Sequence, residues 1–136
     1  MKIVYRDLPK WKYQLLEDWH TRTDMTGFDI TKDLFSLGEY GLLIVCRGYC
    51  WDGPSGPTID TKSFMRGSLA HDVFYQMMRE KLLPMSVRKT ADKVLVKLCR
   101  EDGMSWVRRK YVYRSLRMFA RGAAKTKGVM KILRAP

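Results

Sequence analysis

The fold is decided at residues 51–57, which read Trp51-Asp52-Gly53-Pro54-Ser55-Gly56-Pro57. This stretch is dense in residues that favour turns, so we expect a rigid loop in which Asp52 and Ser55 bond nearby backbone amides. Before the loop, apolar and polar residues alternate as they do in β-strands; after it, apolar residues recur with the spacing of α-helices. The loop therefore separates a strand-forming half from a helix-forming half.

The residues before the loop predict a small, mostly antiparallel sheet. Residues 13–22 alternate in polarity and are rich in aromatic and β-branched side chains, which is typical of a strand. Residues 28–35 predict a second strand. Residues 42–49 predict a third, preceded by a glycine-bounded turn at residues 37–41.

Three helices are predicted after the loop. The first begins at Thr61 or Ser63, either of which can cap it, and runs to about Leu82, because a proline follows. The other two cover residues 86–103 and 105–121; each begins at a serine that can cap it and ends at or next to a glycine.

These patterns predict one α+β domain over residues 1–122, followed by a basic C-terminal arm or frayed helix at residues 123–136. A chain of 136 residues with 46% hydrophobic residues is long and apolar enough to bury one core. No apolar run is long enough to span a bilayer, and residues 1–7 lack the apolar core of a signal peptide. We therefore expect a cytosolic protein.

Three cysteines, Cys46, Cys50 and Cys99, give an odd count. A zinc site would need more thiols or paired histidines. We expect these residues to be reduced cysteines of the core, and no cofactor is indicated by them.

A polar cluster joins the loop to the helices. His71 and Asp72 lie in the middle of the first helix, and Asp92 lies at the edge of the apolar stripe of the second, where it could face the first. The candidate catalytic residues are Asp52, Ser55, His71, Asp72 and Asp92.

This cluster could have either a chemical or a purely structural role. His71, Asp72 and Asp92 could bind a divalent metal, or His71 could act as an acid or base. Alternatively, the two carboxylates accept hydrogen bonds from serine, tyrosine, arginine or backbone donors and fix the helices without doing chemistry.

Three segments, residues 48–57, 66–75 and 86–92, carry a resemblance when they are taken in this order. They resemble the bacteriophage and prophage family known as domain of unknown function 1353, whose pattern is a G-F-x-x-D-G-x-S-x-P loop, an H-D-x-x-Y helix and a later R-x-x-A-D helix. The match extends over about residues 10–120, and the matching positions are Asp52, Gly53, Ser55, Pro57, His71, Asp72, Tyr75, Arg88, Ala91 and Asp92. The chain departs from the pattern at Tyr49-Cys50 and in its long basic C-terminus.

The resemblance implies a phage origin but no reaction. The expected location is then the host cytoplasm or the phage virion, and the expected partners include other phage structural proteins. The His-Asp pair also resembles the metal-dependent phosphohydrolases named for that dipeptide, but the further histidines that those enzymes need are not supplied in order by this chain.

The positive charge is concentrated in the C-terminal part. The net charge is +12, and no acidic residue follows Asp102, although ten lysines and arginines do. The predicted third helix carries one cationic stripe, which basic residues of the arm extend: Lys110, Arg114, Arg117, Arg121, Lys125, Lys127 and Lys131. Such a face is either simply solvated or binds an anionic partner, either nucleic acid or an acidic protein surface.

Three functions remain open at this point. The chain could be a phage accessory protein that binds a polyanion or a virion component through its basic face. It could be a small metal-dependent hydrolase that uses the Asp/His-Asp/Asp cluster. It could also be an intracellular factor that inhibits a host protein.

Overall fold

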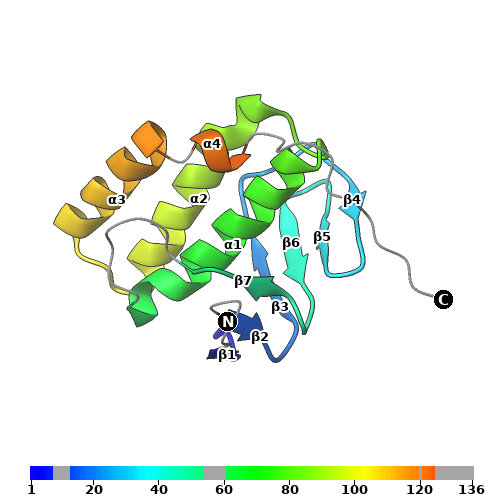
Figure 1. Cartoon of the computed structure of the whole chain (residues 1–136), viewed down its shortest axis with the longest axis horizontal. Coiled ribbons are helices and arrows are strands. Elements are labelled where there is room, and N and C mark those ends of the chain that lie inside the picture. The colour runs from blue at the N-terminus through cyan, green and yellow to red at the C-terminus, as the bar shows by residue number, and fades with distance from the viewer. Residues whose placement is uncertain (8–12, 54–60, 120, 125–136) are drawn as a thin grey trace.

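The computed structural model describes residues 1–7, 13–53, 61–119 and 121–124, and Figure 1 shows their arrangement. The first half forms two small antiparallel sheets and the second half forms helices. The predicted α+β fold class is therefore confirmed. The strands are β1 (Tyr5–Asp7), β2 (Tyr13–Leu15), β3 (Trp19–Arg22), β4 (Ile30–Thr31), β5 (Phe35–Leu37), β6 (Leu42–Val45) and β7 (Cys50–Trp51).

The strands divide between a three-stranded sheet, β1-β2-β7, and a four-stranded sheet, β3-β6-β5-β4. The predicted strand at residues 13–22 is interrupted between β2 and β3 because the chain changes partners there. Leu16 N–H still bonds to the carbonyl of Val4, whereas the Asp18 carboxylate accepts the backbone N–H of Arg47 at 2.7 Å. From Trp19 onward the chain pairs with β6 instead.

The predicted strand at residues 28–35 is instead the start of a hairpin. Ile30–Thr31 forms β4, and Lys32 N–H donates to the carbonyl of Phe35 at 2.9 Å, which closes the turn into β5. The third predicted strand, residues 42–49, ends early at Val45. The chain then turns through Gly48, whose φ of 97° suits glycine, before it enters β7.

The helices are α1 (Lys62–Arg79), the short 3₁₀ helix η1 (Met85–Val87), α2 (Arg88–Glu101), α3 (Trp106–Phe119) and α4 (Arg121–Ala124). Three predicted helices are therefore present, with a separate short α4 after them. The predicted third helix ran to residue 121, but α3 ends at Phe119.

The helix ends differ from the expected caps in two places. Thr61 precedes α1 but its side chain does not cap the helix, and Ser86 lies inside η1 rather than at the start of α2. Ser105 does cap α3, because its hydroxyl accepts the backbone N–H of Arg108 at 3.3 Å. α1 ends at Arg79, before the left-handed residue Lys81, rather than at Leu82.

α1 is the central element: the strands lie on one side of it and α2 and α3 on the other (Figure 1). One apolar core joins the strands to α1, and a second lies between the start of α1, α2 and α3. α1 and α2 approach closely at Gly67, where an added Cβ would lie 2.8 Å from the carbonyl oxygen of Leu95. The site is built around this pair of helices.

Two expectations concern the chain as a whole. Among the described residues, no helix combines the length and the apolar character needed to cross a bilayer. The prediction that all three cysteines lie in the core is wrong for Cys46 and Cys50, which are only partly buried. Cys99 does belong to the core, where burial raises the pKa of its thiol to about 12.

Candidate functional site

The two halves of the His-Asp pair point to different neighbours. Consecutive residues of an α-helix are turned by about 100° relative to each other. His71 therefore contacts Asp92 of α2, whereas the Asp72 carboxylate accepts a hydrogen bond from the backbone N–H of Asp52, just after β7. The structure thus divides the predicted cluster into two sites on α1.

The first site is centred on Asp92, whose side chain has no exposure to solvent. Its Oδ1 atom accepts the Tyr75 hydroxyl at 2.6 Å and lies 2.8 Å from Nε2 of His71. Its Oδ2 atom accepts Nη1 of Arg117 at 2.9 Å. One carboxylate therefore joins α1, α2 and α3.

A second arginine completes this network. Arg88, which is buried, donates through Nε to the Tyr75 hydroxyl at 3.2 Å. Its Nη2 atom donates to the carbonyl oxygens of Leu116 and Arg117 at 2.8 and 3.0 Å. Arg88 thus holds the last turn of α3 as well as the tyrosine that contacts Asp92.

Burial and hydrogen bonds together determine the protonation of this network. Burial lowers the pKa of His71 and keeps its imidazole neutral, although Asp92 acts in the opposite direction. Burial alone would raise the pKa of Asp92, but hydrogen bonds from His71, Tyr75 and Arg117 outweigh it and hold the pKa below its usual value. Because an ionised carboxylate can only accept, Nε2 of His71 is the nitrogen that carries the proton.

The second site lies where α1 faces the end of β7. Burial, followed by the nearby charge of Asp52, raises the pKa of Asp72 to about 7. Next to it, the Tyr49 hydroxyl donates to Oε1 of Gln76 at 2.7 Å, and burial raises the pKa of that hydroxyl. Asp52 is exposed, so this site combines a proton-binding carboxyl near neutral pH with access to solvent.

The predicted catalytic residues are therefore not all brought together. Asp92 and His71 belong to the first site, Asp52 and Asp72 to the second, and Ser55 lies outside the described residues. The predicted metal ligands His71, Asp72 and Asp92 do not converge, because neighbouring helix positions direct Asp72 away from Asp92. In the part of the chain that the structure describes, no group of three or more histidine, cysteine, aspartate and glutamate side chains is placed to hold a metal ion.

The predicted cationic stripe is also divided. Lys110 and Arg114 are exposed on α3, but Arg117 turns inward to Asp92 and is not part of an open stripe. Arg121 begins α4, a separate short helix that contacts both α1 and α3 instead of continuing α3 (Figure 1). The remaining predicted residues, Lys125, Lys127 and Lys131, lie outside the described residues.

Tyr75 and Arg88 were not among the predicted site residues, although both fill the first site. A signal for them exists in the sequence: Tyr75 follows His71 by four residues, and Arg88 precedes Asp92 by four. Residues four apart lie on one face of a helix. Two such pairs on consecutive helices indicate a polar contact between those helices.

We expect Asp92→Asn to lower the free energy of unfolding by about 3–5 kcal/mol, because it leaves buried donors without their charged acceptor. Chemical denaturation measures this change. Glu101→Gln is the control: it removes a carboxylate whose side chain is 49% exposed and should cost about 1 kcal/mol or less. Equal costs for the two variants would show that the buried network contributes no special stability.

We expect Asp72→Asn to raise stability at pH 8 and to leave it unchanged near pH 4. A raised pKa means that the folded protein binds a proton which the unfolded chain has released, so Asp72 reduces stability as the pH rises from about 4 to about 7. The gain at pH 8 should be about 1–2 kcal/mol, after allowance for the partial exposure of Asp72. Urea titrations at both pH values check this, and a gain that is the same at both would contradict it.

The comparisons with known proteins give no family for this chain. No family model matches it, and neither a curated protein nor a solved structure shows significant similarity to it. The resemblance to the family of domain of unknown function 1353 therefore stays a prediction from its three motifs.

Proposed function

We propose that this chain is a bacteriophage accessory protein that binds nucleic acid through the outer face of α3. We call this surface the α3 outer face and define it as Trp106, Val107, Lys110, Tyr111, Arg114 and Met118. The observation that carries the proposal is that large apolar side chains stand exposed beside free cations on this helix.

The exposure of these side chains is unusual for a folded domain. Trp106 is 64% exposed, Val107 70%, Tyr111 51% and Met118 72%. The opposite face of the same helix is buried through Val112 and Leu116. Apolar side chains gathered on one exposed face are typical of a surface that contacts another molecule.

The basic side chains of α3 also fall into two groups, one bonded inside the protein and one on the outer face. Arg109 donates to the carbonyl of Met104, and Arg117 pairs with Asp92, so both are used inside the protein. Lys110 and Arg114 lie on the α3 outer face, and no ion pair found among the described residues involves either of them. The Lys110 amine lies 4.9 Å from the centre of the Trp106 ring, which keeps the charge beside the aromatic surface.

Nucleic acid is the partner that suits both kinds of side chain. Phosphates bind lysine and arginine, and unpaired bases stack on exposed aromatic rings. No acidic residue after Asp102 opposes the approach of a polyanion. A single strand is favoured over a duplex, because its bases are free to stack on Trp106 and Tyr111.

We expect a labelled 20-nucleotide single strand to bind the protein at low salt and to be released as salt is raised, as fluorescence anisotropy would show. Lys110→Gln/Arg114→Gln should weaken binding by about tenfold and reduce the slope of log affinity against log salt by roughly 1–2. Trp106→Ala/Tyr111→Ala should weaken binding with little change in that slope.

The matched control is Lys93→Gln/Lys97→Gln, which removes two exposed charges at the same spacing from α2. It should change the affinity by less than about twofold, an effect of net charge alone. The proposal fails if no binding occurs at low salt, or if the α3 double variant and the α2 double variant weaken binding equally.

A second candidate function rests on the pKa of Asp72, which is raised to about 7 beside the exposed Asp52. Such a carboxyl can act as a general acid or base in hydrolysis. If the chain is a hydrolase, Asp72→Asn should reduce turnover of a phosphodiester such as bis-p-nitrophenyl phosphate, with Mg²⁺ or Mn²⁺ supplied, by about a hundredfold or more. No turnover by the unmodified protein on phosphoester and peptide substrates would exclude this candidate.

A further inference from the structure

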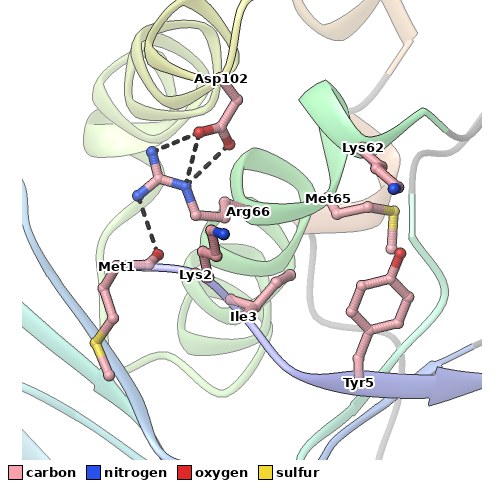
Figure 2. Close-up of a pocket in the computed structure, with 8 residues that line it drawn as sticks. All are labelled: Met1, Lys2, Ile3, Tyr5, Lys62, Met65, Arg66 and Asp102. Carbon is pink, nitrogen blue, oxygen red and sulfur yellow. Dashed lines mark hydrogen bonds and ion pairs between the residues drawn. The ribbon is translucent and has the colours of Figure 1, made fainter.

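A hollow of about 520 Å³ lies between the N-terminal segment and the first turns of α1 (Figure 2). Its apolar lining comes from Met1, Ile3, Tyr5 and Met65. Ile3 and Tyr5 also pack against the main core, so this side of the hollow is fixed to the body of the protein. The volume falls in the range of pockets that hold small organic molecules.

Arg66 lines the hollow and hydrogen-bonds to the other segments that form it. Its Nε atom donates to both carboxylate oxygens of Asp102, at 3.0 and 2.9 Å, and its Nη2 atom lies 3.2 Å from Oε2 of Glu101. Its Nη1 atom donates to the carbonyl of Met1 at 3.5 Å. The hydrogen bonds to Asp102 raise the pKa of Arg66, so this guanidinium stays charged and is already neutralised by its partners.

Two further cations line the same hollow. Lys2 comes from the N-terminal segment and Lys62 from the first turn of α1. In Figure 2 the Lys2 amine lies on the Arg66 side of the hollow and the Lys62 amine on the Tyr5 side. None of the ion pairs found among the described residues includes either lysine.

We propose that this hollow is a binding site for a small organic anion with a flat apolar body. The apolar body would replace water on Met1, Ile3, Met65 and the Tyr5 ring. Its carboxylate, sulfonate or phosphate group would pair with Lys2 on one side of the hollow or with Lys62 on the other. Arg66 is a positioning residue, because its charge is taken up by Asp102 and Glu101 while its bonds hold the walls together.

This site is independent of the proposed nucleic-acid surface. None of its lining residues belongs to the α3 outer face. The hollow is sized for one compact molecule, and four apolar side chains line it, whereas a strand of nucleic acid needs a continuous cationic track. The two surfaces can therefore be tested separately on the full chain.

The probes are 2-naphthoate and its neutral analogue 2-naphthamide, titrated into the ¹⁵N-labelled protein and followed by NMR. We expect 2-naphthoate to bind saturably at one site and to shift the amide signals of Ile3, Tyr5, Lys62 and Met65. Its affinity should exceed that of 2-naphthamide by about tenfold, and Lys2→Gln/Lys62→Gln should remove most of that difference. Lys93→Gln/Lys97→Gln removes the same charge from α2 and should leave the naphthoate affinity unchanged.

Several outcomes would overturn the proposal. Shifts confined to α3, or shifts that never saturate, would show that the hollow is not the site. Equal affinities for 2-naphthoate and 2-naphthamide would show that the lysines do not select an anion. Equal losses in the two lysine variants would show an effect of net charge only.

Discussion

A carboxylate without solvent contact is stable in a folded protein only when hydrogen-bond donors surround it, and Asp92 meets this condition through residues from two other helices. Tyr75 and His71 come from α1, and Arg117 comes from α3. Each donor reaches Asp92 only if its helix is correctly placed. The positions of α1, α2 and α3 relative to one another therefore depend on satisfying this one charge.

Because Asp92 needs these hydrogen-bond donors, His71 and Asp72 do not act together as one site. His71 is used to satisfy Asp92, with its imidazole kept neutral by burial, so it is not available to a substrate or a metal ion. Asp72, one position further along α1, faces Asp52 and has a pKa near 7. Chemistry, if the chain performs any, has its best-placed proton at Asp72 rather than at the histidine that the motif suggests.

The division into strands before Trp51 and helices after residue 60 could be predicted from the sequence, because it depends on local alternation and on helical spacing. The separation into two sheets and the strand β1 were not predicted. The breaks within the predicted strands could not be predicted, because they depend on contacts with residues far away in the sequence. The interruption after Leu15 follows from the bond between Asp18 and Arg47, 29 residues away. The inward turn of Arg117 was missed for the same reason, since its spacing matched the cationic stripe and only Asp92, 25 residues earlier, explains its direction.

The division of α3 into an inner and an outer face restricts the kinds of partner that its surface can bind. Its inner side supplies Val112, Leu116 and Arg117 to the fold, and these contacts are enough to attach the helix. The α3 outer face adds tryptophan, tyrosine and methionine side chains that are 51–72% exposed and that favour aggregation if they stay uncovered. A purely electrostatic partner would need only Lys110 and Arg114, and a purely apolar partner would be weakened by those charges. A partner that carries negative charge and flat apolar rings together meets both conditions, and a single strand of nucleic acid has this composition in every nucleotide.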